Sequence, residues 1–246
     1  MNTDQKRNIL RHIYAHASWT ENSSYACTKG CATCCTQSVT MTTLEGLDII
    51  AFLKSNKTVS LEVLFGTYRP GKQKKNLLTT NEFARKCLTE TLTDDEEEGG
   101  DAWDFSPCVF LQDNSCSIYP VRPFGCRGFA STSRCDQKGF AEVPELIVIL
   151  NTLCLQLIEH LDLGGLWGNI NDVLFWLLAK EKNEEMERSN VSGLNLKTNE
   201  RIYGFLVPPE EQQSVRDIFA PILSSQFQNS SLGELINIDV MGKNGQ

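Results

Sequence analysis

Four of the ten cysteines of the chain fall within nine residues, in the segment Cys27-Thr-Lys-Gly-Cys31-Ala-Thr-Cys34-Cys35. A thiolate is a soft, strong ligand for transition metals, and a short loop can wrap several thiolates around one ion or cluster. A second group lies far downstream and comprises Cys108, Cys116, Cys126 and Cys135. We therefore predict that the two segments meet in space and build a metal centre from these eight thiols.

The spacing of the cysteines leaves the division of the ligands open. Neither C-x3-C-x2-C-C nor C-x7-C-x9-C is the paired C-x2-C arrangement of a zinc ribbon. Adjacent side chains diverge in extended backbone, so Cys34 and Cys35 are expected to be awkward ligands for a single ion. Seven or eight thiolates could make two four-thiolate sites, or one such site beside partly protonated neighbours. Tetrahedral thiolate sites suit zinc and iron–sulfur clusters alike, and we expect a [4Fe-4S] cluster or Zn²⁺, with the cluster favoured.

Two arginines, Arg122 and Arg127, bracket Cys126. They could donate hydrogen bonds to cluster sulfurs or bind an anionic substrate, which makes both of them candidates for binding a cofactor. The alternative is that they hold the local turn by bonding carbonyl groups, because a guanidinium does both well. Tyr119 is expected to pack within a hairpin, although it could also line the metal site.

The remaining cysteines and the histidines give weaker signals. Cys87 and Cys154 lie on apolar faces of predicted helices, so we expect buried, reduced thiols there. His12 and His16 share a helical face but lack the acidic partner of the HExxH zinc motif. We therefore predict an ordinary surface pair for these two histidines.

The composition disfavours several classes of protein. The chain carries 23 basic and 31 acidic residues, a net charge of −8, and an acidic chain without a basic stripe is a poor nucleic-acid binder. The most apolar segments after the N-terminus, Leu146–Leu150 and Val173–Ala179, are much shorter than the roughly 20 residues that span a membrane. We see no signal peptide and expect a cytoplasmic protein, in which clustered cysteines indicate metal or redox chemistry.

Helical periodicity predicts the elements that must position the thiols. The predicted helices cover residues 3–19, 42–55, 81–92, 144–163, 169–182 and 209–223. Thr42 and Glu45 have the spacing of a capping box at the start of the second of these helices. Gly164-Gly165 is predicted to join two apolar helices into an αα-hairpin, and Tyr203–Val207 could be a short strand.

The predicted architecture is mainly α: helices clamp an irregular, cysteine-rich metal-binding region with one small β-hairpin. The hairpin is expected where Cys108–Leu111 and Cys116–Tyr119 flank Gln-Asp-Asn-Ser. Residues 1–140 are predicted to form the cysteine-cluster region with its N-terminal helices. A helical part over 141–224 packs on it, and 225–246 form a flexible tail. Between these elements, Thr93–Asp101 is read as an acidic linker and Lys72, Lys74 and Lys75 as a solvated loop.

The cysteine pattern resembles that of the bacterial CxxCxxCC family, also called the YkgJ-type cysteine cluster proteins. The segments that carry the resemblance are Cys27-x3-Cys31-x2-Cys34-Cys35, Pro107-Cys108-Val-Phe-Leu111, Cys116-Ser-Ile-Tyr119 and Arg122-Pro123-x2-Cys126-Arg127. The first gap is three residues here, where the family name has two. The resemblance implies a zinc- or iron-chelating module over roughly residues 27 to 127. It leaves the helical C-terminal part uncovered.

Two further resemblances suggest enzymes. The flagellin lysine N-methylase has a similar cysteine pattern and is associated with an iron–sulfur cluster, which implies the alternative of a protein-modifying enzyme. Cys27-x3-Cys31-x2-Cys34 also matches the three-cysteine motif of radical S-adenosylmethionine enzymes, but the chain lacks the alternating strands and helices of their β/α barrels.

Three functions remain open at this point. A purely metal-binding or interaction protein predicts a closed site, whereas an enzyme predicts an open cluster position or a pocket lined by Arg122, Arg127 or Tyr119. Metal storage or delivery predicts exposed cysteines. The expected partner is a metal ion or cluster, with a protein partner or protein substrate left open, and we expect neither nucleic acid nor membrane.

Overall fold

The computed structural model describes residues 1–17, 19, 25–28, 30–56, 77–94, 105–182 and 193–238. The helices are α1 (Thr3–His16), α2 (Thr43–Ser55), α4 (Thr80–Leu88), α6 (Phe124–Arg127), α7 (Cys135–Lys138), α8 (Glu145–Leu161), α9 (Ile170–Lys182), α11 (Gln212–Ser224) and α12 (Leu232–Leu235), with 3-10 turns η2 (Tyr119–Val121) and η3 (Pro209–Glu211). The strands are β1 (Thr40–Thr42), β2 (Leu111–Gln112), β3 (Ser115–Cys116), β4 (Leu166–Asn169), β5 (Leu196–Thr198), β6 (Gln226–Phe227) and β7 (Ser230–Ser231). The prediction of a mainly α fold is confirmed. The predicted basic loop at 72–75 and most of the acidic linker lie outside the described residues.

Reciprocal capping boxes begin the helices of the N-terminal half. Thr42 and Glu45 form the one predicted at the start of α2, and Thr79 and Glu82 form another at the start of α4. In each pair the N-cap hydroxyl accepts from a backbone N–H and the carboxylate accepts from the N-cap backbone. These local bonds fix where the helices begin.

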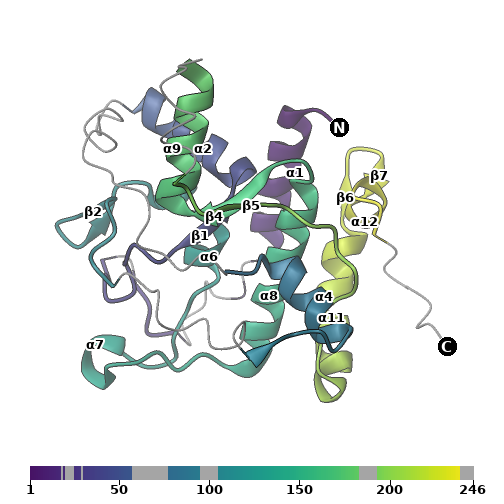
Figure 1. The fold of residues 1–246 in the computed structure, drawn as a ribbon. Coiled ribbons are helices and arrows are strands. Elements are labelled where there is room, and N and C mark those ends of the chain that lie inside the picture. The colour runs from purple at the N-terminus through teal and green to yellow at the C-terminus, as the bar shows by residue number, and fades with distance from the viewer. Residues whose placement is uncertain are drawn as a thin grey trace.

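A small antiparallel sheet of strands β1, β4 and β5, in that order, crosses the middle of the molecule (Figure 1). Strand β4 lies between α8 and α9, so the prediction of a plain αα-hairpin joined by glycines was wrong. Gly164, with φ of +88°, turns the chain after α8, and the next residues pair with β1 and β5 on both sides. Four residues are too few to show a strand period in the sequence.

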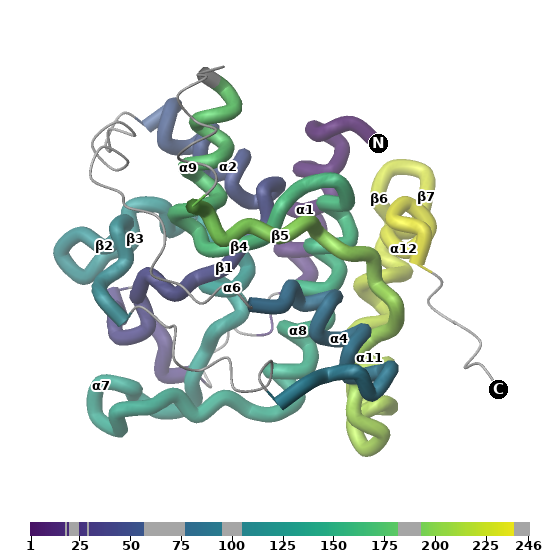
Figure 2. Tube along the Cα trace, viewed as in Figure 1, coloured from purple at the N-terminus to yellow at the C-terminus, as the bar shows by residue number. Residues whose placement is uncertain are grey.

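The first hydrophobic core gathers around α8. Leu150, Leu153 and Leu157 of this helix are at most 1% exposed, and they pack with the apolar faces of α1 and α11. Full burial of one such side chain contributes roughly 1.5–3 kcal/mol. The helices on both sides of residue 140 thus share one core, with α11 and α12 on the right of Figure 2.

The second hydrophobic core joins α2 and α9 to the cysteine-bearing region. Ile49 of α2 and Val173 of α9 are fully buried together with Phe110 and Ile118, which flank the β2–β3 hairpin. The hairpin and α7 lie on the left of Figure 1, opposite α11 and α12. The cysteine region is therefore anchored to the helical body through a few apolar side chains.

The flexible tail predicted over 225–246 is folded as far as the structure describes it, to residue 238. Strands β6 and β7 form a hairpin, and Ser231 and Glu234 form a capping box on α12. Leu232 and Ile236 are at most 3% exposed. The prediction was wrong for residues 225–238, because the burial of these isolated apolar residues orders a Ser- and Asn-rich stretch, whereas 239–246 lie outside the described residues.

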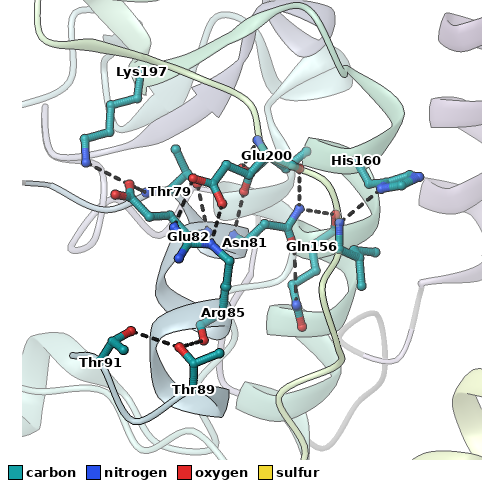
Figure 3. A network of polar contacts seen from close by, with 12 residues as sticks. Thr79, Asn81, Glu82, Arg85, Thr89, Thr91, Gln156, His160, Lys197 and Glu200 are labelled. Carbon is teal, nitrogen blue, oxygen red and sulfur yellow. Dashed lines mark hydrogen bonds and ion pairs between the residues drawn. The ribbon is translucent and has the colours of Figure 1, made fainter.

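Buried polar side chains bind α4 to α8 and to residues 199–206 (Figure 3). The Asn81 backbone N–H donates to the Glu159 carboxylate at 2.8 Å, and the Asn81 amide donates to the Gln156 carbonyl at 3.0 Å. The Gln156 side chain donates to the Gly204 carbonyl and accepts from the Leu206 N–H. Because side chains of α8 take up these backbone groups, Tyr203–Val207 is not the strand that we predicted.

No helix in the described part of the chain is both long and apolar enough to cross a bilayer.

His160 makes folding stability sensitive to acid. Its Nδ1 accepts from the Ile202 N–H at 3.1 Å and its Nε2 donates to the Ile236 carbonyl at 2.8 Å, a pattern that only the neutral ring satisfies. Burial, followed by the charges of Arg201 and Lys6, lowers the pKa of His160 below its ordinary 6.5.

The His160 contribution to the free energy of unfolding should be complete above the unfolded pKa and be lost as pH falls from 6.5 through the folded value. Between pH 7.5 and pH 5, we expect the free energy of unfolding measured in urea to fall more for the wild type than for a His160→Gln variant. Equal losses in the two proteins would contradict this role.

Candidate metal centre

Tight turns shape the upstream cysteine loop. The Cys31 N–H donates to the Thr28 carbonyl and the Cys35 N–H to the Ala32 carbonyl, both at 2.9 Å. A further bond from the Thr36 N–H to the Cys34 carbonyl bends the chain again, so the backbone is not extended here. The thiols of Cys34 and Cys35 are consequently hydrogen-bonded to each other. The expectation that these neighbours diverge was wrong, because it assumed extended backbone.

Main-chain bonds join the end of this loop to the downstream cysteines. The Cys108 N–H donates to the Cys35 carbonyl at 2.9 Å, and Thr36 forms an antiparallel bridge with Pro107. The Gln37 N–H donates to the Ser106 carbonyl at 3.0 Å. The two cysteine segments, about seventy residues apart in the sequence, therefore meet side by side.

A separate pair of bonds holds the start of the loop. The Ala26 N–H donates to the Ser131 carbonyl at 2.8 Å, and the Ser131 N–H donates to the Cys27 sulfur at 3.2 Å. Four residues after Ser131 the chain reaches Cys135 at the first position of α7. Cys27 is thereby placed on the side of the site where Cys135 lies.

The predicted hairpin is present, with a tighter turn than expected. Leu111 pairs with Cys116 and Gln112 with Ser115, which leaves a two-residue loop. Asp113 and Asn114 have φ of 48° and 58°. Positive φ at both central residues is the type I′ geometry that matches strand twist, and Asn and Asp tolerate it. The hairpin holds Cys116 opposite Leu111 and brings it near Cys108.

Backbone N–H groups donate to Cys27, Cys108 and Cys116, among other sulfurs. The donor is Ser131 for Cys27, Phe110 for Cys108 and Ile118 for Cys116. Burial raises the pKa of each of these thiols, and the amide bond opposes that rise by stabilising the thiolate. A metal cation that displaces the proton would find sulfurs already oriented by donors.

Cys126 lies on α6, and its thiol is strongly desolvated. Burial raises its pKa to about 12, with further contributions from Cys108 and Cys116. The backbone N–H of Phe124 at the start of α6 donates to the Glu45 carboxylate at 2.8 Å. This bond to α2 fixes the start of α6 and so the position of the Cys126 thiol.

Seven of the eight predicted cysteines line one cavity of about 700 Å³: Cys27, Cys31, Cys34, Cys35, Cys108, Cys116 and Cys126. Tyr119, Arg122 and Arg127 line it too. The eighth, Cys135, lies on an adjoining cavity of about 440 Å³ together with Cys27 and Cys31. An all-sulfur wall of this kind fits zinc or an iron–sulfur cluster.

The thiols surround these cavities without converging on a point. Among the residues that the structure describes, no three Cys, His, Asp or Glu side chains stand close enough together to hold a metal ion as placed. Zinc–sulfur bonds are about 2.3 Å long. A metal bound by these thiols would require the walls of the cavity to move inward.

The two arginines are used differently. Arg127 donates from Nε to the Arg122 carbonyl at 2.9 Å and from a terminal nitrogen to the Pro120 carbonyl, and it lies 4.7 Å from the Tyr14 ring centroid. The Arg122 guanidinium lies 4.0 Å from the Tyr119 ring centroid, and its buried Nε has no hydrogen-bond partner among the described residues. Arg127 thus bonds the turn, whereas Arg122 keeps a donor beside the cysteines.

Gln37 positions the site, and its role had no signal in the sequence. Its amide donates to the Ser106 hydroxyl and accepts from the Asn171 amide, both at 3.0 Å. The Asn169 amide donates to the Gln37 carbonyl. Gln37 therefore connects the cysteine loop to residues 105–108 and to the junction of β4 and α9.

The other candidates lie outside the site. Cys154 is fully buried in the first core, as predicted, whereas Cys87 on α4 is only half-buried, so the prediction of a buried thiol was wrong at that position. His12 bonds the Ser225 hydroxyl at 2.7 Å, and His16 bonds the His12 carbonyl. Neither histidine faces the cysteines.

The segment that carries these cysteines matches a known protein family. Residues 26–146 match the model of the CxxCxxCC family, described as "Putative zinc- or iron-chelating domain". The matched segment contains all eight cysteines of the predicted centre. Neither a search of curated proteins nor one of solved structures gave a match.

Gln37→Ala should weaken metal binding without removing a ligand. Loss of its two side-chain bonds should cost about 1 kcal/mol of stability and lower metal affinity roughly tenfold, because the loop is no longer held against residues 105–108. A chelator competition assay measures the affinity. Gln213→Ala is the matched control, since that exposed side chain bonds Asp217, one turn away on α11, and no other residue in the described part of the chain. Equal affinities for both variants would refute the positioning role.

Proposed function

We propose that the protein uses the cysteines of its CxxCxxCC domain, the family to which residues 26–146 belong, to hold an iron–sulfur cluster or zinc. The family is one of zinc or iron chelation, and the choice between the two is our inference. One observation carries the proposal of a cysteine-ligated centre: seven thiols line a single cavity, while all three histidines lie elsewhere. A wall of sulfur donors selects soft metals over magnesium or calcium.

We favour the cluster over a single zinc ion. A cavity of about 700 Å³ has more room than one ion needs, and more thiols line it than one ion can bind. Amide donors to Cys27, Cys108 and Cys116 are the kind of bond that tunes a cluster. When bound, such a cluster supplies electron transfer or a Lewis-acidic iron. The residues around it orient the sulfurs and supply the charge of Arg122.

A metal-dependent protein-modifying enzyme is the second candidate, and the cavity favours it over a closed structural site. The space beside the thiols is lined by Tyr119, Arg122 and Arg127, as the enzyme hypothesis requires. Arg122, whose Nε has no partner in the described part of the chain, could bind an anionic group of a substrate or donate to a cluster sulfur. Cys31 and Cys34 are exposed, which also suits metal exchange.

Purification without oxygen should yield a brown protein that contains iron and acid-labile sulfide, with broad absorption near about 400 nm. The metal-free protein should melt about 5–10 °C below the protein kept at a free metal concentration of about 100 times Kd. The reason is that the metal binds only the folded chain. Elemental analysis and differential scanning calorimetry check both points. A colourless protein with stoichiometric zinc contradicts the cluster, and a protein without metal contradicts the proposed function.

Arg122→Gln should mainly change metal affinity, whereas Arg127→Gln should mainly change the stability of the fold. Arg122→Gln should lower metal affinity about tenfold with only a small change in melting temperature, because its Nε has no hydrogen-bond partner among the described residues and its one ring contact is with Tyr119 at the cavity wall. Arg127→Gln should destabilise the fold by about 1–3 kcal/mol, because it bonds two carbonyls and stacks on Tyr14. Calorimetry of the metal-free proteins and chelator competition separate the two effects. The same profile for both variants would show that the arginines share one role.

A further inference from the structure

The cysteines are held in two groups by two independent sets of main-chain bonds. In the first group, the bond from the Cys108 N–H to the Cys35 carbonyl places these residues together. The hairpin and α6 then bring Cys116 and Cys126 to the same cavity. Cys35, Cys108, Cys116 and Cys126 thus line one cavity together.

The second group gathers around Ser131. This residue receives a bond from the Ala26 N–H and donates its own N–H to the Cys27 sulfur. Cys27, Cys31 and Cys135 line the second cavity together. None of the four sulfurs of the first group lines this cavity, and Cys135 does not line the first one.

The number of thiols also exceeds the capacity of one centre. A zinc ion or a [4Fe-4S] cluster takes four cysteines. With Cys35, Cys108, Cys116 and Cys126 assigned to one centre, Cys27, Cys31 and Cys135 remain, and all three line the second cavity. A single shared site would leave them without a function.

We propose that the domain holds two metal centres, the first ligated by Cys35, Cys108, Cys116 and Cys126 and the second by Cys27, Cys31 and Cys135. The inference rests on the proposed function, which it extends by dividing the ligands. Cys34 hydrogen-bonds Cys35 on the wall of the first cavity and serves the first centre as a donor.

The two centres differ in coordination. Four thiolates close the first centre, as in structural sites. Three thiolates leave the second centre with a position that cysteine does not fill, open to water or to a ligand. Cys27 and Cys31 line both cavities, so the second centre lies where the cavities adjoin.

Native mass spectrometry of the full chain tests the division by counting bound centres. The protein is loaded with Co²⁺ or reconstituted with ferrous iron and sulfide. We expect two centres in the wild type, one in Cys116→Ser, one in Cys31→Ser, and none in the double variant. Cys31 is exposed, so its replacement spares the core, and Cys135→Ser should give the same count. Cys87→Ser, outside both groups, should keep two.

The contrary outcomes are distinct. One centre in the wild type, or loss of all metal in each single variant, means a single shared site and overturns the division while the proposed function stands. If Cys31→Ser still holds two centres, Cys31 is not a ligand of the second centre and the proposed division is wrong. A wild type that binds neither cobalt nor iron refutes the proposed function itself.

Discussion

One buried carboxylate connects the helical core to the cysteine region. Glu45, 3% exposed, accepts hydrogen bonds from Thr42 at the start of α2, from the Tyr14 hydroxyl of α1, and from the Phe124 N–H of α6. Burial raises the pKa of Glu45, and these donors oppose the rise by stabilising the charge. Cys126 follows Phe124 by two residues, so the placement of this thiol depends on a bond made in the core.

The two halves of the site are held with unequal firmness. Each downstream thiol at Cys108, Cys116 and Cys126 lies two residues from a buried apolar side chain, Phe110, Ile118 or Phe124 respectively, and is fixed by it. The described residues from 30 to 36 include no buried side chain, and mainly main-chain bonds hold them. The thiols line cavities without converging, so closure on a metal falls mainly to the upstream loop. Metal binding and ordering of that loop are then one event.

The sequence allowed good prediction wherever one signal dominated. Periodicity and the Thr42–Glu45 spacing located α2, and the residue type alone indicated that distant cysteines meet. Strand β4 was missed because its four residues show no period and its partners are far away in the chain. The hydrogen bond between the Cys34 and Cys35 thiols depends on a turn for which the local residue types give no signal. The bonds of Gln37 link residues that only the folded chain brings together, so they could not be predicted.

The long separation between the cysteine segments explains why the helices matter to the metal. Bringing together residues about seventy positions apart costs loop-closure entropy, which grows slowly with length but is substantial from the start. Here the cores and the β1–β4 pairing already hold both segments in place, so this entropy is lost when the helices fold. The metal needs only to order the short upstream loop. Affinity for the metal is thus coupled to the stability of the helical core, and a change such as loss of the Glu45 bonds would reach the thiols without touching one.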